Sequence, residues 1–196
     1  MRTGRVVWVG IVAVALGACS RHAPPATPAP QVDTMAAARA RADSARAARE
    51  TAARIRAEEE ARARAAAEAL QRARAALTAP IHFDFDRSLV RDDDRAVLEA
   101  KVELLRANPD VRLRIEGNAD ERGSEEYNLA LGMRRAGAAR DYIVGYGVAA
   151  DRLGTMSNGE DKPVDPGHDE SAWAKNRRDD FVITAGGELL KAVALR

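Results

Sequence analysis

The chain has 196 residues, and its 31 Lys and Arg nearly balance its 30 Asp and Glu. This length allows one domain of ordinary size plus additional segments. Residues 1–79 carry 13 basic against 7 acidic side chains, whereas residues 80–196 carry 18 against 23, a net charge of −5. An acidic second half argues against a nucleic-acid-binding domain there.

The first 19 residues have the pattern of a targeting segment. Arg2 and Arg5 precede an apolar run that ends at Leu16, followed by Gly, Ala and the only cysteine, Cys19. The run is too short to span a bilayer as a helix, and a single cysteine excludes an internal disulfide. The pattern resembles a bacterial lipobox, which predicts a signal peptide at 1–18 and acyl chains on Cys19. An ordinary signal peptide with a stray cysteine, or an uncleaved apolar start, is the alternative.

A proline-rich tether and a long helix are expected next. Residues 19–32 contain four prolines and no apolar periodicity, which predicts an extended, semi-rigid tether. Residues 33–79 contain no Pro or Gly and are rich in Ala, Arg and Glu, which predicts a helical spacer capped by Asp33 or Thr34. A solvated single helix is the simplest interpretation. No sustained seam of Leu or Ile defines a coiled coil, but an Ala-faced oligomer, or an Arg face lying on anionic polymer or lipid headgroups, remains open.

The folded domain is expected at residues 80–184, because every Phe and Tyr lies beyond Pro80. The alternating pattern predicts an opening strand at 81–86 with Phe83 and Phe85 on the same side. The whole pattern predicts a β-α-β-α-β-β order, and so a two-layer α+β domain with its helices on one face of a mixed sheet. Residues 185–196 have a Gly-Gly break and are expected to form a loose tail.

The stretch 116–136 holds the candidate site. A polar loop with Asp120 leads into a helix that carries Asn128, Arg134 and Arg135. A carboxylate, an amide and a guanidinium between apolar positions indicate a binding site for a small zwitterion rather than a nucleophile with its base. Adjacent helical residues point about 100° apart, so only one of the two arginines can face a ligand. From the residues alone, the simpler interpretation is structural: Asp120 caps a turn and Arg135 belongs to an ion pair.

Six motifs occur in the same order as in a known family. They are EGNADERGSEEYN from Glu116, LGMRRA from Leu131, GVAADRL from Gly147, SNGEDKP from Ser157, GHDE from Gly167 and KNRR from Lys175. This stretch resembles the peptidoglycan-associated lipoproteins (Pal), which carry an OmpA-like peptidoglycan-binding domain. The resemblance implies an outer-membrane lipoprotein that faces the periplasm, binds the diaminopimelate-containing stem peptide of the cell wall non-covalently, and docks on the β-propeller protein of the Tol system.

The resemblance also implies the site residues. Those that bind the wall peptide are Phe85, Asp86, Asp120, Asn128 and Arg135. In this scheme Asp120 accepts from the ligand ammonium and Arg135 offers its planar fork to a carboxylate. Asn176, Arg177 and Arg178 are expected to hold loops by hydrogen bonds.

The sequence departs from the family at several places and leaves other functions open. Asn158 stands where Pal proteins commonly have Tyr, and Asp179-Asp180 and the tail are unexpected. One alternative is a wall anchor for another envelope machine. The other is a wall hydrolase, which would use one of two clusters as metal ligands or as acid and base, but no histidine pair has ligand spacing. The clusters are His82, Asp84 and Asp86, or His168, Asp169 and Glu170. No cofactor, metal or nucleic acid is therefore expected.

Overall fold

The computed structural model describes residues 33–192. The predicted signal peptide, Cys19, the proline-rich tether and the last four residues lie outside this range. The chain divides into two units, residues 1–52 and 53–196. Among the described residues, no helix is long and apolar enough to cross a membrane.

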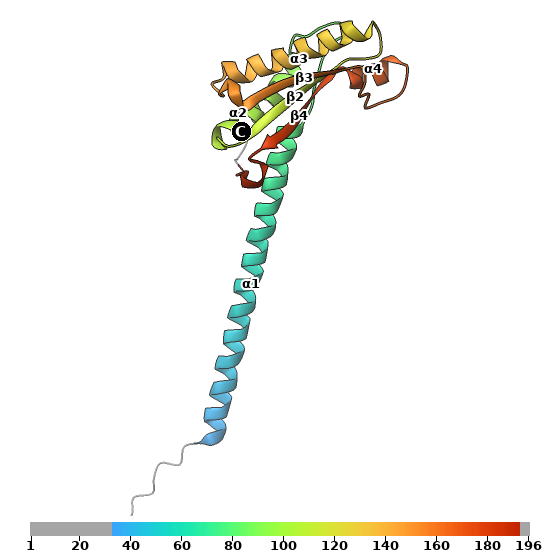
Figure 1. Ribbon diagram of the computed structural model, residues 1–196. Coiled ribbons are helices and arrows are strands. Elements are labelled where there is room, and N and C mark those ends of the chain that lie inside the picture. The colour runs from blue at the N-terminus through green and yellow to red at the C-terminus, as the bar shows by residue number, and fades with distance from the viewer. Residues whose placement is uncertain (1–32, 193–196) are drawn as a thin grey trace, which may run out of the picture. The chain divides into compact units, whose positions relative to one another are not determined.

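Helix α1 (Thr34–Thr78) confirms the expected long Ala/Arg/Glu helix (Figure 1). Asp33 caps it, because its Oδ1 accepts hydrogen bonds from the backbone N–H groups of Met35 and Ala36, at 3.0 and 3.2 Å. Ion pairs one turn apart, such as Arg46–Glu50 at 3.0 Å, lie along its exposed surface. Most of the helix is solvent-exposed, as its composition predicts.

The second unit contains a four-stranded mixed sheet with the order β1-β4-β2-β3. Its strands are β1 (Ile81–His82), β2 (Arg112–Asn118), β3 (Leu153–Gly159) and β4 (Arg178–Ala185). Strand β2 is parallel to β3, whereas β4 runs antiparallel to both β1 and β2. Helix α2 (Arg95–Ala107) follows β1, α3 (Glu125–Gly145) connects β2 to β3, and the short α4 (Glu170–Asn176) precedes β4. This arrangement confirms the predicted α+β fold.

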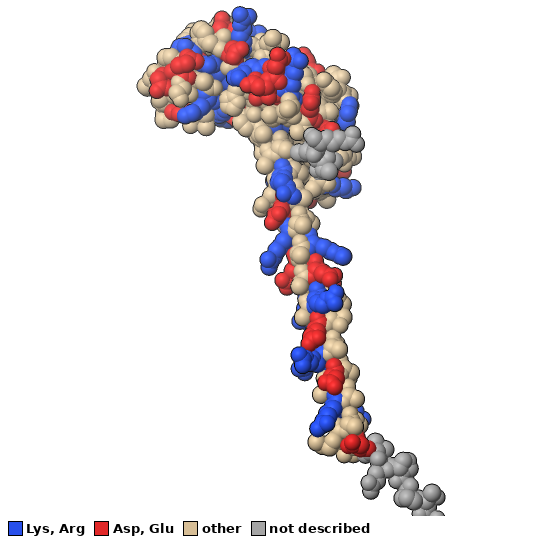
Figure 2. Space-filling view, turned by 180° about the vertical axis from the view of Figure 1, so that it is seen from behind, with Lys and Arg blue, Asp and Glu red and all other residues tan. Residues whose placement is uncertain are grey.

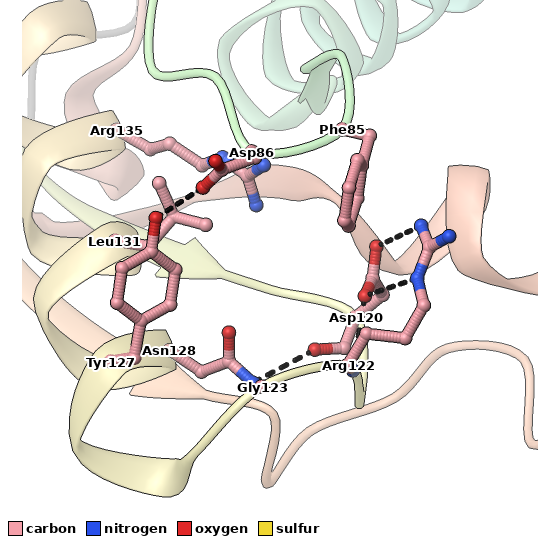
Figure 3. Close-up of a pocket in the computed structure, with 9 residues that line it drawn as sticks. All are labelled: Phe85, Asp86, Asp120, Arg122, Gly123, Tyr127, Asn128, Leu131 and Arg135. Atoms are coloured by element: carbon pink, nitrogen blue, oxygen red, sulfur yellow. Dashed lines mark hydrogen bonds and ion pairs between the residues drawn. The ribbon is translucent and has the colours of Figure 1, made fainter.

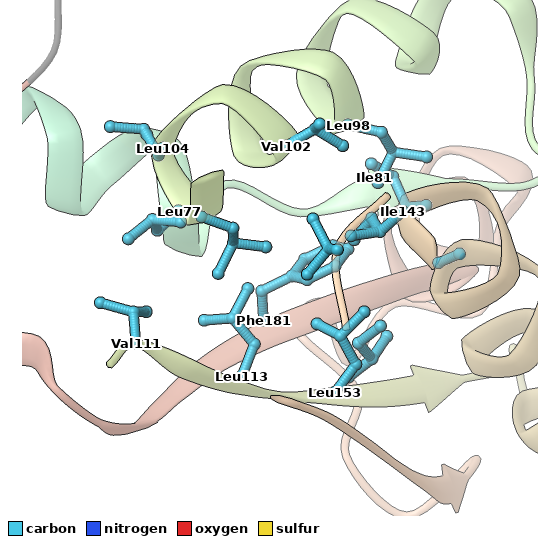
Figure 4. Packing of buried hydrophobic residues seen from close by; sticks show 14 of the residues in the cluster. Leu77, Ile81, Leu98, Val102, Leu104, Val111, Leu113, Ile143, Leu153 and Phe181 are labelled. Atoms are coloured by element: carbon cyan, nitrogen blue, oxygen red, sulfur yellow. The ribbon is translucent and has the colours of Figure 1, made fainter. Parts of the chain in front are cut away.

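The core lies between the sheet and the helices (Figure 4). Leu113 and Ile115 of β2 alternate with polar residues, so both point toward the helices, and each is at most 1% exposed. Phe181 of β4 and Ile143 of α3 meet them in the same cluster. The core also includes Leu77, 0% exposed, so the last turns of α1 pack with the domain although the sequence places them in the spacer.

A buried lysine joins α1 to α2. Lys101 is 0% exposed, and its Nζ donates to the backbone carbonyls of Ala76, Leu77 and Ala79 at 2.7–3.0 Å. These carbonyls belong to the end of α1, where helical partners run out. Burial lowers the pKa of Lys101 to about 7, while the three acceptors and the Phe181 ring 4.2 Å away favour the charged ammonium.

Two predicted segments differ from the structure. The strand expected at 81–86 ends at His82, and a turn follows in which Asp86 has a φ of 53°. Phe83 is therefore buried while Phe85 is 54% exposed, so the prediction that both lie on one side is wrong. The expected loose tail is instead ordered as far as it is described, because the Asn108 side chain bonds both the N–H and the carbonyl of Lys191.

Acidic and basic side chains are intermixed on the face drawn in Figure 2. They alternate along α1 and over the domain rather than gathering by sign. On this face, the described residues therefore form no large patch of one sign that would steer a polyanion.

Candidate ligand pocket

A pocket of about 240 Å³ brings together all five residues expected at the site. The turn after β1 supplies Phe85 and Asp86, the β2–α3 loop supplies Asp120, and α3 supplies Asn128 and Arg135 (Figure 3). The remaining lining residues are Arg122, Gly123, Tyr127 and Leu131. Three segments that are distant in the sequence therefore form one small pocket, whose lining includes side chains of both charges.

Asp86 places an exposed carboxylate on one side of the pocket. Its left-handed backbone is a conformation that Asp tolerates better than most residues. The Tyr127 hydroxyl donates a hydrogen bond to Asp86 Oδ1, as the dashed line in Figure 3 shows. This bond raises the pKa of Tyr127 above its ordinary value, so the hydroxyl keeps its proton.

Asp120 lies deeper and is only 4% exposed. Its Oδ1 accepts from the backbone N–H and Nε of Arg122, at 3.1 and 3.0 Å. Its Oδ2 accepts from Arg122 Nη2 at 2.8 Å and from Arg177 Nη1 at 3.2 Å. Burial opposes ionisation, but these bonds outweigh it and hold the pKa of Asp120 below its usual range. Asp120 is thus an ionised carboxylate with intramolecular partners at both oxygens.

Arg135 is fully buried behind the pocket surface, at 0% exposure. Its Nε, Nη1 and Nη2 donate to the backbone carbonyls of Arg87, Asn118 and Asp84 at 2.8, 2.7 and 3.1 Å. Burial lowers the pKa of Arg135 to about 10, which leaves it charged at neutral pH. The neighbouring Arg134 is exposed and lies over the Tyr127 ring, so helix geometry does direct only one of the two inward.

Asn128 and Phe85 complete the walls. The Asn128 amide donates to the Asp120 carbonyl at 3.1 Å and also to Glu160, which ties α3 to two loops. The Phe85 ring lies 4.0 Å from the Arg122 guanidinium. Each side chain is therefore held by neighbours, which gives a ligand pocket of defined shape.

Sequence reasoning missed Arg122 and Tyr127 as pocket residues. Tyr127, Leu131 and Arg135 are spaced by four residues and so form one row along α3. That spacing could have predicted that the three side chains lie on the same side of the helix, and so at the same site. Arg122 lies only two residues from its partner Asp120, whereas its aromatic neighbours Phe85 and Trp173 come from distant segments.

The cluster at 168–170, one of the two that the hydrolase hypothesis would use, holds loops together. His168 contacts Glu121 at 2.8 Å, and Asp169 caps α4 by accepting from the Ala172 N–H at 2.9 Å. Glu170 pairs with Arg177 at 2.8 Å. Among residues 33–192, no group of three or more His, Cys, Asp or Glu side chains could hold a metal ion.

Asn158 and the Asn-Arg-Arg segment also have structural partners. Asn158, 7% exposed, donates to Glu116 Oε2 at 3.2 Å and to Asn118 Oδ1 at 3.0 Å, so it joins β3 to β2. The Asn176 carboxamide oxygen accepts from the N–H groups of Val164 and Asp165 at 2.8 and 3.0 Å. These bonds fix the segments that surround the pocket.

Comparison with known proteins identifies the domain type. The OmpA family model matches residues 82–177. The peptidoglycan-associated lipoprotein of Haemophilus influenzae is 48% identical over 98 residues, which are 50% of this chain and 64% of that protein. The peptidoglycan-associated lipoprotein of Rhizobium meliloti is 47% identical over 107 residues, 55% of this chain and 61% of that protein. The chain thus spans a little under two thirds of the length of these curated relatives.

A solved structure agrees with the sequence comparison. The crystal structure of the peptidoglycan-associated lipoprotein from Burkholderia pseudomallei has 44% sequence identity and a TM-score of 0.53. The match covers 54% of this chain and 89% of that chain.

Proposed function

The chain belongs to the OmpA family, and from that premise we propose that its folded domain binds the diaminopimelate-containing stem peptide of peptidoglycan non-covalently. The observation that carries the proposal is the single pocket that gathers Phe85, Asp86, Asp120, Asn128 and Arg135. The end of a diaminopimelate side chain bears an ammonium and a carboxylate, and the pocket holds charges of both signs. Its volume of about 240 Å³ suits one amino-acid end group rather than a glycan chain.

The buried charges give the pocket its electrostatic character. Asp120 and Arg135 are both ionised, and neither can be removed without leaving buried partners unsatisfied. No covalent step is required, because recognition uses charge and shape alone. The chain is accordingly proposed to be a binding protein and not an enzyme.

Binding to intact cell wall tests this function. The purified full-length chain in detergent should co-sediment with diaminopimelate-type sacculi, and Asp120→Ala or Arg135→Ala should abolish co-sedimentation. Arg134→Ala is the matched control, because it removes the same charge one residue away without opening the buried site. It should retain binding within about threefold, as for a surface substitution.

The thermal unfolding of each variant must be recorded beside its binding. Loss of binding in a variant that still unfolds cooperatively supports the site. Unchanged sedimentation of both pocket variants would contradict the site assignment. A wild-type chain that stays in the supernatant would contradict the proposed function.

At the level of the cell, we propose that the chain tethers the outer membrane to the wall. Acyl chains on Cys19 form the membrane end, and the folded domain forms the wall end. The similarity to peptidoglycan-associated lipoproteins further supports a role in the Tol-Pal system, which maintains envelope integrity and constriction at division. Crosslinking in living cells should then capture a periplasmic β-propeller protein, and capture of components of another envelope machine would favour the alternative anchor function.

A further inference from the structure

The basic charge of helix α1 lies in its first half. Residues 34–57 carry six Arg against two acidic side chains, a net charge of +4, whereas residues 58–78 carry four Arg against four Glu. All six arginines of the first half are exposed. They are Arg39, Arg41, Arg46, Arg49, Arg54 and Arg56. The helix therefore begins with a basic half and continues with a neutral half that leads to the domain.

Most of these arginines have no intramolecular partner for their charge. Arg46 pairs with Glu50 at 3.0 Å, and the other five form no ion pair with any residue between 33 and 192. The second half of the helix holds as many Glu as Arg, so its charges compensate one another on average. The first half thus exposes uncompensated positive charge to solvent.

Helical geometry gathers this charge on one side of the segment. Successive residues turn by about 100°, so five of the six arginines fall within one half of the circumference. Asp43 and Glu50 share that half, which leaves it with a net charge of +3. The opposite half contains Arg41 and Ile55 among Ala, Ser and Thr. On the face drawn in Figure 2 the signs alternate along α1, so the excess is an average over the segment and not a compact patch.

The segment can bind an anionic surface but has no apolar face to insert into it. Met35 and Ile55, its only large apolar residues, are 65% and 51% exposed and lie on opposite sides of the helix. An amphipathic helix that enters the hydrocarbon of a membrane needs a continuous apolar face. Contact is therefore electrostatic, at the level of charged headgroups, and weakens as salt is added.

The position of the segment in the chain favours the membrane as its partner. Thr34 begins α1 fifteen residues after Cys19, and fifteen residues span at most roughly 50 Å. Residues 34–57 are about 36 Å long as a helix. With Cys19 acylated, as proposed above, the headgroups lie within reach of the whole segment. A tether also raises the effective concentration of the two partners to about millimolar, so a weak attraction suffices.

We propose that residues 34–57 form a membrane-docking segment, whose arginines are attracted to the phosphate groups of anionic lipids in the leaflet that holds the acyl chains. This inference rests on the proposed lipid anchor and goes beyond it, because the anchor alone requires no contact between α1 and the headgroups. The wall-binding pocket takes no part in this contact. High ionic strength or loss of anionic lipid frees the segment, which lengthens the span available between membrane and wall.

Energy transfer on vesicles tests the inference. The full-length acylated chain is reconstituted into vesicles of phosphatidylcholine, with or without the anionic lipid phosphatidylglycerol, and the headgroups carry an acceptor dye. The donor dye is attached at Ala53→Cys, an exposed position on the arginine side, while acylated Cys19 has no free thiol. The test variant combines Arg49→Gln, Arg54→Gln and Arg56→Gln. The matched control places Lys at the same three positions and so keeps the charge.

The expected result is transfer that follows lipid charge. In the wild type it should increase with the fraction of phosphatidylglycerol and return to the phosphatidylcholine level at high salt. A basic residue near an anionic surface favours binding by about fivefold, so the Gln variant should lower the ratio of docked to undocked chains at least tenfold. The Lys control should keep the ratio within about threefold. Circular dichroism should show the same helix content in all three proteins.

Four results would overturn the inference and leave wall binding by the domain intact. Transfer in the wild type that ignores phosphatidylglycerol would exclude docking, and equal losses in the Gln and Lys variants would assign the effect to an altered helix. Transfer that follows the surface density of protein instead of lipid charge would favour the Ala-faced oligomer. Weaker co-sedimentation of the Gln variant with sacculi, without a response to phosphatidylglycerol, would assign the segment to the wall polymer.

Failure of the anchor itself is a separate outcome. A chain that separates from vesicles of both kinds would overturn the proposed membrane end of the tether, and this inference with it.

Discussion

Asp179 is a buried carboxylate whose two oxygens have no hydrogen-bond partner among the described residues. It is 0% exposed and lies two residues before the core residue Phe181 on β4, so both side chains point to the same, helix-covered face. Burial raises the pKa of Asp179 well above its ordinary range, while the charge of Arg135 works in the opposite direction. Asp179 therefore favours the protonated form in the folded protein.

This shift predicts a specific pH dependence of stability. A raised native pKa contributes stability that is fully present below the unfolded pKa, about 3.9 for Asp, and is lost as pH rises through the native value. Within that window the wild type should lose up to about 1.4 kcal/mol of unfolding free energy per pH unit relative to Asp179→Asn. Denaturant unfolding of both proteins between pH 4 and 9 measures the difference. A difference that does not change with pH would contradict the assignment.

At the scale of elements, helix α3 approaches the sheet through two glycines. A Cβ built on Gly117 of β2 would lie 1.9 Å from the Gly132 carbonyl oxygen, and one on Gly132 would lie 2.3 Å from Ser157 Oγ. Backbone contact this close brings α3, with Asn128 and Arg135, within reach of the loop that carries Asp120. The position of the helix thus sets the width of the pocket.

Two glycines on the same helix offer a matched test of this contact. Gly132→Ala should lower the free energy of unfolding by about 1–3 kcal/mol, the usual cost of overpacking, because helix and sheet must move apart. Gly137→Ala has no atom within 4 Å of the new Cβ and should raise stability by about 0.5–1 kcal/mol through helix propensity. Thermal unfolding compares the two. Equal effects of both substitutions on the free energy of unfolding would show that the close contact between Gly132 and the sheet does not limit the stability of the fold.

Helix α1 is attached to the domain by its last turns. Leu77 packs in the core, Lys101 caps the terminal carbonyls, and Arg74 Nη2 donates to the Gly187 carbonyl at 2.6 Å. The segment after β4 therefore has a structural role, because it contacts the end of α1. The Arg74–Gly187 contact joins residues 113 positions apart in the sequence.

At the scale of the whole molecule, the proposed tether requires an anchor at its membrane end. Cys19→Ser should move the chain from the outer-membrane fraction to the soluble periplasmic fraction, because the serine hydroxyl does not accept the acyl chains that hold it. Immunoblotting of separated cell fractions measures this, with Ser20→Ala as the control. Retention of Cys19→Ser in the outer membrane would contradict anchoring through this residue.

The sequence alone determined the long helix, the α+β order and the resemblance to the family, because each depends on local periodicity or on ordered motifs. It also named five residues that the structure brings to one pocket. Local pattern failed at Phe85–Asp86, where alternation predicts a strand but the chain turns.

Only the tertiary structure decided which of the pocket charges are accessible. Arg122 and Arg177 neutralise Asp120, and backbone carbonyls from two separate segments occupy Arg135. Burial and ion pairing depend on residues that are distant in sequence and adjacent in space, so no single stretch of the chain encodes them. For that reason the sequence shows Asp120 and Arg135 as charges, whereas only the structure shows that Arg122 pairs with Asp120 between the rings of Phe85 and Trp173.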